Sequence, residues 1–257
     1  MRRVDLNCDM GESYGAYTIG DDAAILPFVS SANIACGFHG GDPSVMRATV
    51  HAAAAHRVAI GAHPGLPDLA GFGRREMAVT PQEVYDMTSY QVGALRGITH
   101  AAGARMYHVK PHGALYNMAA VRKEIADAIA LAIRDTDASL TLVGLSGSCL
   151  IDAGRAQGLR TASEVFADRN YQPDGTLVPR AQPNAIVHDV DLAAARAVRM
   201  VQTHRVTAVD GSDIAVLADT VCIHGDGPHA LQFAQRIRAA LTAADIAVLA
   251  LGAPTHA

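Results

Sequence analysis

The sequence predicts an α/β protein whose parallel strands close into a β/α barrel. Short apolar runs alternate with amphipathic helical runs along all 257 residues, which is the pattern of βα units around a parallel sheet. Polar side chains recur at the carboxyl ends of nearly all the expected strands, whereas a doubly wound sheet, the alternative architecture, concentrates its site at one switch point. Because no repeat, linker or low-complexity stretch interrupts the pattern, residues 1–257 are expected to form a single domain.

Seven apolar runs have the length and composition of buried strands. They cover residues 3–9, 31–37, 58–62, 105–110, 140–145, 159–165 and 220–224. The first run alternates Val4, Leu6 and Cys8 with polar residues, so one face is apolar and the other is polar. In a barrel the aliphatic face packs on the outer helices and the other face lines the interior. The alternation therefore predicts a polar barrel interior.

Helix starts are marked by capping residues. Asp42 supplies an acceptor at an N-cap and Pro43 follows it in the first turn. Residues 80–83, with the sequence TPQE, form a capping box ahead of a long helix. Two further helices are expected to start at Asp189 or Asp191 and at Gly227-Pro228. Asp42 is thus expected to be a helix cap and not a catalyst.

Two connections are longer than the others. HPGLPDLAGFGRRE (63–76) follows the third strand, and ADRNYQPDGTLVPRAQPNA (167–185) follows the sixth. Loops of this length in a compact domain are usually lids or binding loops. A further segment, TAVDGSDIAVLA, predicts a small hairpin that turns at Asp210-Gly211.

Composition excludes several classes of function. A net charge of -4 without a basic run argues against a nucleic acid or an anionic membrane as partner. The first residues lack the apolar stretch of a signal peptide, and no apolar run approaches a membrane span of about 20 residues. Cysteines without CxxC spacing are expected to be free thiols in a reducing compartment: Cys8, Cys36, Cys149 and Cys222. A cytoplasmic location is expected.

Polar residues on the interior face of the strands are expected to meet at one mouth of the barrel. The expected members are Asn7, Asp9, His39, His63, Lys110, His112, Glu164, His224 and Asp226. Asp5, deeper in the first strand, is expected to be a buried hydrogen-bonding group. A single histidine at a strand end is more often structural, but burying so many ionisable groups without a function would cost several kcal/mol.

Lysine usage singles out one member of this mouth. Of the 21 lysines and arginines only Lys110 and Lys123 are lysine. Lys123 is expected to be an exposed helix residue, whereas Lys110 falls on the interior face of the fourth strand. A chemical role is expected for Lys110.

Six blocks, DLNCDMGES, ANIACGFHGGDP, GAHPGLPDLAGFGRR, VKPHGALYN, EVFADRNYQPDGTLVPR and CIHGDGPHA, resemble the LamB/YcsF family. The resemblance runs from Asp5 to about Leu251. It implies an irregular seven-stranded β/α barrel like that of the glycoside hydrolase/deacetylase superfamily. It also implies the hydrolytic ring opening of 5-oxo-L-proline to L-glutamate, coupled to ATP hydrolysis in a 5-oxoprolinase complex with subunits B and C.

Hydrolysis of a lactam needs a base for water, donors for the developing oxyanion and a cation for the substrate carboxylate. The expected catalytic residues are the carboxylates Asp9 and Glu12, with His39 and His63 as alternate bases, and the charge-stabilising pair Lys110 and His112. Arginines of the two long loops are expected to bind the substrate carboxylate: Arg74, Arg75, Arg169 and Arg180. The other expected substrate-binding residues are Asn7, Asn33, Glu164, His224 and Asp226. The GDGP turn at residues 225–228 is expected to aim a helix N-terminus at the mouth.

Two alternatives remain open. Related barrel deacetylases bind zinc through one Asp and two His, for which Asp9, His39 and His63 are the counterparts here; the chain would then be a metal-dependent amidohydrolase or deacetylase for another small cyclic amide. The family resemblance itself implies no metal, and none is predicted. The second alternative is a subunit that presents substrate without catalysing. Because neither lysine stands in a GxxxxGK[ST] loop, ATP is expected to be handled through the complex.

Overall fold

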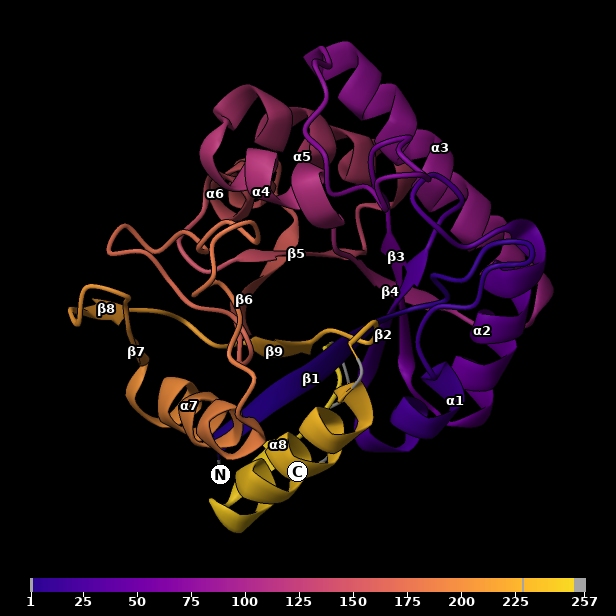
Figure 1. Ribbon diagram of the computed structural model, residues 1–257. Coiled ribbons are helices and arrows are strands. Elements are labelled where there is room, and N and C mark those ends of the chain that lie inside the picture. Colours follow the sequence, from indigo (N-terminus) through magenta and orange to yellow (C-terminus); the bar gives the residue numbers. More distant parts are fainter. Residues whose placement is uncertain (1, 228, 252–257) are drawn as a thin grey trace.

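The computed structural model describes residues 2–227 and 229–251. Its parallel strands form the closed seven-stranded barrel that the sequence predicts (Figure 1). The barrel strands in spatial order are β1 (Arg2–Met10), β2 (Ser31–Ala35), β3 (Ala59–His63), β4 (Met106–Val109), β5 (Thr141–Leu145), β6 (Arg160–Phe166) and β9 (Thr220–Ile223). Pairing of β9 with β1 closes the ring. Each of these strands coincides with one of the seven predicted runs.

The register of the first strands places their polar residues at one level. Asp9 on β1 lies opposite Asn33 on β2, and Asn7 lies opposite Cys222 on β9. The β3–β4 pair is irregular, because its register shifts between Ile60 and Gly61. A Cβ atom at Gly61 would overlap the ring of His108, which lies inside the barrel at that point. Glycine is therefore required there for steric reasons.

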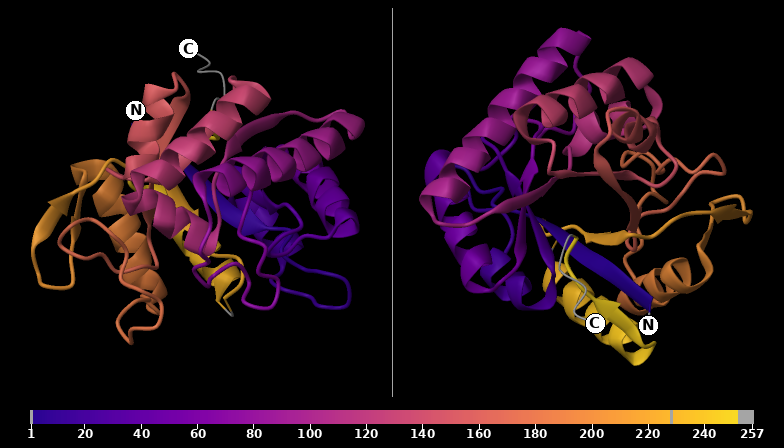
Figure 2. Two further views of the ribbon diagram at one scale, coloured as in Figure 1. Left: turned by 90° about the horizontal axis from the view of Figure 1, so that it is seen from above. Right: turned by 180° about the vertical axis from the view of Figure 1, so that it is seen from behind.

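Helices surround the barrel, as both views of Figure 2 show. They are α1 (Asp22–Ile25), the short 3-10 helix η1 (Leu26–Phe28), α2 (Pro43–Ala55), α3 (Pro81–Ala101), α4 (Gly113–Val121), α5 (Lys123–Asp137), α6 (Cys149–Ala156), α7 (Val190–Thr203) and α8 (Ala230–Ala243). The predicted caps at Asp42 and Thr80 are confirmed, and Asp189, not Asp191, caps α7. Of the described helices, none is long and apolar enough to cross a membrane.

The carboxyl-terminal segments hold one confirmed prediction and one omission. β7 (Arg205–Thr207) and β8 (Asp213–Ala215) form the predicted antiparallel hairpin. The sequence analysis missed β10 (Ile246–Val248), which extends the sheet by pairing with the start of β1. α8 begins at Ala230, later than the predicted Gly227-Pro228 start, and Pro228 lies outside the described residues.

Alternation along the strands separates an apolar layer from a polar interior. On β1, Leu6 and Cys8 face the helices and are fully buried. The intervening Asn7 and Asp9 bond instead to polar side chains inside the barrel, Thr220 and Lys110. The apolar core thus lies between the strands and the helices, while the barrel interior carries hydrogen-bonding groups.

Candidate functional site

A pocket of about 400 Å³ opens at the carboxyl ends of the barrel strands. Eight of the predicted site residues line it: Asp9, His63, Arg74, Lys110, His112, Arg169, Arg180 and His224. The other predicted residues lie around it. Asn7, Asn33 and Glu164 are buried in the barrel. Glu12 and His39 are buried beside the lining histidines, and Asp226 is ion-paired to Arg74.

Lys110 is the cation at the floor of the pocket. Its Nζ lies 2.9 Å from Asp9 Oδ1 and 3.0 Å from Glu164 Oε1, and it donates to Cys222 Sγ at 3.0 Å. Burial by itself lowers the pKa of Lys110, but Asp9, Cys222 and Glu164 raise it by more, so that it ends well above its usual value. The ammonium charge is therefore shared among buried acceptors before any substrate arrives.

Asp9 is held from three sides. Its Oδ1 accepts from Lys110 and from Asn33 Nδ2 at 2.8 Å, and its Oδ2 lies 3.3 Å from His63 Nε2. Burial raises the pKa of Asp9, but His63 and Lys110 outweigh burial and hold it well below its usual value. Asp9 is thus an ionised carboxylate on the wall of the pocket.

A hydrogen-bonded ladder continues below Asp9. Asn33 Nδ2 donates to Asn7 Oδ1 at 2.7 Å, and Asn7 Nδ2 donates to Thr220 Oγ1 at 2.6 Å. Thr220 in turn donates to Asp5 Oδ2 at 2.6 Å, so Asp5 is the buried hydrogen-bonding group that the sequence predicts. His108, which sequence reasoning did not assign to the site, bonds to Asn33 Oδ1 at 2.7 Å, and burial lowers its pKa to about 3. Sequence reasoning could have assigned His108 to the site from its position on the interior face of β4.

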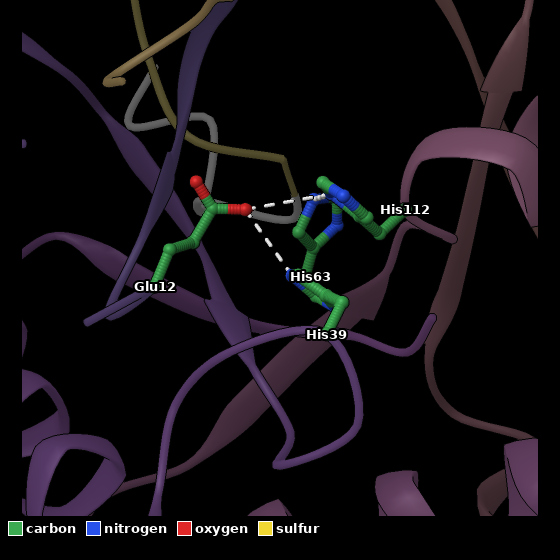
Figure 3. Close-up of side chains that lie close together, drawn as sticks. All are labelled: Glu12, His39, His63 and His112. Atoms are coloured by element: carbon green, nitrogen blue, oxygen red, sulfur yellow. Dashed lines mark hydrogen bonds and ion pairs between the residues drawn. The ribbon is translucent and has the colours of Figure 1, made fainter. Parts of the chain in front are cut away.

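Three histidines and a glutamate form a second cluster beside the pocket (Figure 3). Glu12 Oε1 lies 3.2 Å from His39 Nε2 and 3.4 Å from His112 Nδ1. His112 Nδ1 lies 2.9 Å from His63 Nε2, and the ring of His39 stacks on that of His112. Burial, together with the charge of Asp9, raises the pKa of Glu12 well above its usual value, and burial lowers the pKa values of His39 and His112.

This cluster differs in its members from the metal triad considered from the sequence. Potential ligand atoms of Glu12, His39, His63 and His112 all lie within 4.8 Å of one another. Asp9 belongs to a different group, with Cys222 and His224. The predicted triad of Asp9, His39 and His63 is neither of these two groups, although Asp9 Oδ2 lies 3.3 Å from His63 Nε2.

Charged residues of the long loops form the rim of the pocket. Arg74 Nη2 pairs with Asp226 Oδ2 at 2.6 Å. Arg169 Nη2 donates to the Val178 carbonyl at 2.6 Å. The prediction for Arg75 is wrong: its side chain is 68% exposed and pairs with Asp68 outside the pocket. Asp68 accepts a hydrogen bond from Arg75 Nε at 3.0 Å, which accounts for the different direction of the two neighbouring arginines.

Asp168 is a rim residue that the sequence analysis missed. Its Oδ2 lies 2.7 Å from His224 Nδ1 and so orients the ring of His224 toward the pocket. Sequence reasoning could have considered Asp168 because it lies in the long loop after β6. That loop contains several polar residues, so its position alone did not single out Asp168.

The closed barrel defines a β/α-barrel protein with a pocket lined by charged residues at the carboxyl ends of its strands. The chain belongs to the LamB/YcsF family, whose model matches residues 4–256. It is 62% identical to the 5-oxoprolinase A subunit of Tolumonas auensis, over 98% of this chain and 100% of that one. It is 59% identical to the 5-oxoprolinase A subunit of Bacillus subtilis, with 98% of each chain covered. The crystal structure of the lactam utilization protein from Thermus thermophilus superimposes with a TM-score of 0.92 at 51% identity, covering 97% of this chain and 100% of that one.

Proposed function

We propose that the chain is the A component of an ATP-dependent 5-oxoprolinase, which opens the ring of 5-oxo-L-proline to give L-glutamate with partner subunits B and C. The observation that carries the proposal is the full-length identity to relatives of that name. A pocket of about 400 Å³ suits a small cyclic amide. Unpaired cysteines at Cys8, Cys36 and Cys222 support a cytoplasmic location.

The two arginines of the 167–185 loop are proposed to bind the carboxylate of the substrate. Arg169 and Arg180 both line the pocket. Burial and the charge of Arg180 lower the pKa of Arg169 to about 10, and burial and the charge of Arg74 lower that of Arg180. An anion bound between these guanidinium groups would relieve their mutual repulsion and complete their hydrogen bonds.

Asp9 is proposed to receive the proton of the attacking water. Of the two carboxylates singled out in the sequence, Asp9 lines the pocket and Glu12 does not. Hydrolysis adds one water across the ring amide: the water oxygen joins the carbonyl carbon, the C–N bond breaks and the ring nitrogen takes up a proton. A positioned base contributes about 10²–10⁴ in rate to such a step.

Coupling to ATP is proposed to depend on the partner subunits. Opening an unstrained five-membered lactam releases little free energy, so ATP hydrolysis supplies the driving force. Neither Lys110 nor Lys123 stands directly after glycines as a GxxxxGK[ST] loop requires. Phosphoryl transfer is therefore assigned to a partner, and water addition to this barrel.

The test is glutamate release from 5-oxoproline and ATP, with the purified chain alone and reconstituted with subunits B and C. We expect ATP-dependent release from the reconstituted complex only. Robust release by the isolated chain would refute the division of labour, and ATP-independent release would favour a free-standing amidohydrolase. Asp9→Asn, checked for folding by circular dichroism, should abolish turnover in the complex. A chain that only presents substrate would keep it.

Arg180→Gln tests the assignment of the substrate carboxylate. Loss of a charge-assisted contact worth about 1.5–3 kcal/mol should raise KM for 5-oxoproline by about 10- to 100-fold. Arg75→Gln is the matched control, because Arg75 lies in the other long loop and points away from the pocket. Equal effects of the two substitutions on KM would contradict the assignment.

A further inference from the structure

Two histidine rings beside the pocket each turn one nitrogen toward the other. His63 Nδ1 lies 2.7 Å from the carbonyl oxygen of Lys110, and His112 Nε2 lies 2.7 Å from the carbonyl oxygen of Phe72. A carbonyl oxygen only accepts, so each of these nitrogens carries the ring proton. In neutral rings the remaining nitrogens, His63 Nε2 and His112 Nδ1, then both present lone pairs, although they are only 2.9 Å apart.

The carboxyl group of Glu12 adds a third potential ligand atom. Glu12 Oε1 lies 3.4 Å from His112 Nδ1, within the same group as His63 Nε2 (Figure 3). The three atoms come from three separate strand ends, those of β1, β3 and β4, which the barrel holds at fixed distances. Buried ligand atoms this close together need a proton or a metal cation among them, and His63 Nε2 also has Asp9 Oδ2 as a neighbour at 3.3 Å.

We propose that His63 Nε2, His112 Nδ1 and Glu12 Oε1 bind one divalent transition-metal cation, with Zn²⁺ the best match to the ligand chemistry. Two imidazoles and one glutamate are a ligand set of catalytic zinc sites, which keep a further position open for water or substrate. Ligands about 2.0–2.1 Å from a tetrahedral centre lie about 3.3 Å apart. The observed separations of 2.9 and 3.4 Å lie on either side of that value.

His39 is assigned as a positioning residue for Glu12 and not as a ligand. Its Nε2 lies 3.2 Å from Glu12 Oε1, where an N–H would donate to the carboxylate. Its ring is stacked on that of His112, with the ring planes 2° apart, so that His39 and His112 cannot both point a lone pair in the ring plane at one cation. Partners of this kind orient metal ligands and raise metal affinity.

The open side of the site faces the pocket. His63 and His112 line the pocket, whereas Glu12 and His39 lie behind them. A bound cation would therefore meet a ligand in the pocket from the side of the two histidines. The metal site is independent of the proposed 5-oxoprolinase activity, because it rests on the geometry of these side chains.

The experiment measures metal binding by the full-length chain. Protein stripped with a chelator is titrated with Zn²⁺ by calorimetry, and metal content is determined by elemental analysis after dialysis. We expect one Zn²⁺ per chain. X-ray absorption should give nitrogen and oxygen neighbours at about 2.0–2.2 Å without sulfur. Failure of the wild-type chain to retain stoichiometric zinc would overturn the proposal and leave a proton shared by His63 and His112.

Variants locate the cation within the molecule. His112→Gln and Glu12→Gln should each weaken Zn²⁺ binding by more than about 100-fold, and His39→Ala by about 10- to 100-fold. His39→Gln, which keeps an N–H donor, should recover part of that loss. Cys222→Ser tests the neighbouring group of Asp9, Cys222 and His224, and the exposed His51→Gln controls for surface histidines. Loss of binding in Cys222→Ser, or unchanged binding in Glu12→Gln, would refute the assignment.

Discussion

At the scale of single residues, Lys110 shows how much of this barrel depends on compensated charge. Its ammonium group is almost completely buried, and the carboxylates of Asp9 and Glu164 are buried around it. Isolated buried charges are costly, whereas removing one partner of a buried pair leaves the other uncompensated. The ion pairs of Lys110 with Asp9 and Glu164 therefore order the floor of the pocket and make the fold sensitive to substitution of Lys110.

Lys110→Met is expected to lower the free energy of unfolding by about 3–5 kcal/mol, because two buried carboxylates lose their cation. Urea denaturation followed by circular dichroism measures the change. The double variant Lys110→Met/Glu164→Gln should be more stable than the single variant, since one buried charge is removed. Strictly additive losses in this cycle would contradict the ion-pair account. Lys110→Met should also cripple turnover in the reconstituted complex.

Asp168 predicts a pH dependence of stability. Burial raises the pKa of this carboxyl, but His224, Arg180 and Arg169 lower it by more, so the folded-state pKa lies below its usual value. Its ionised form therefore stabilises the fold above the unfolded-state pKa of about 3.9, and that contribution is lost as pH falls through the folded-state pKa. Asp168→Asn should make the free energy of unfolding fall less steeply between about pH 5 and 3 than in the wild type.

Urea denaturation at several pH values in that range measures the slope. Asp152→Asn, on an exposed face of α6, is the control for removing one carboxylate. An acid limb of Asp168→Asn as steep as that of the wild type would contradict the role given to Asp168.

At the scale of elements, the β3–β4 pair depends on a missing side chain. The ring of His108 occupies the space over Gly61, next to the shift in strand register. From this position His108 bonds to Asn33 and supports the polar ladder under Asp9. The absence of a side chain at Gly61 thus allows β3, which carries His63, to pair closely with β4, which leads to Lys110.

Gly61→Ala is expected to destabilise the fold by about 1–3 kcal/mol, because the added methyl group overlaps the His108 ring and the strands must separate. Gly97→Ala is the matched control. Gly97 is exposed within α3 and a Cβ there meets no atom within 4 Å, so alanine should stabilise the helix by about 0.5–1 kcal/mol. Thermal and urea denaturation give both values. A loss of stability in Gly97→Ala comparable to that in Gly61→Ala would refute the steric explanation.

At the scale of the whole molecule, β1 pairs with β10 as well as with its two neighbours in the barrel. β9 pairs with Asp5–Cys8 and closes the barrel, while β10 pairs with the preceding residues, Arg2–Val4. Closure of the ring therefore does not require β10. The segment instead covers the start of β1 and buries Ile246.

A chain ending at Ala244 is expected to keep the closed barrel but to lose about 2–4 kcal/mol, from the burial of Ile246 and the hydrogen bonds to β1. The control is a chain ending at Leu251, which retains β10. Far-ultraviolet circular dichroism reports the fold, and urea denaturation reports the loss. Complete unfolding of the chain ending at Ala244 would show that barrel closure depends on β10.

Local patterns were sufficient for the barrel strands and for the capped helix starts of this fold. The period-two alternation of β1 predicts which side chains face inward, because successive residues of a strand point to opposite sides whatever they contact. Caps such as Asp42 and Thr80 act on amides two or three residues away, so their sequence context determines them. The sequence analysis missed β10 because a strand of three residues is too short to show a hydrophobic alternation.

The sequence by itself determined the barrel strands, the polar interior and the group of residues at the mouth. Tertiary structure alone decided which of these residues meet. His63 and His112 are 49 positions apart, and their facing nitrogens depend on the path of the loop that brings the Phe72 carbonyl to His112. The neighbours Arg74 and Arg75 diverge because only one reaches Asp226 across the barrel. Side-chain direction along a strand is a local property, whereas each pairing depends on strand register and loop conformation set by contacts distant in the chain.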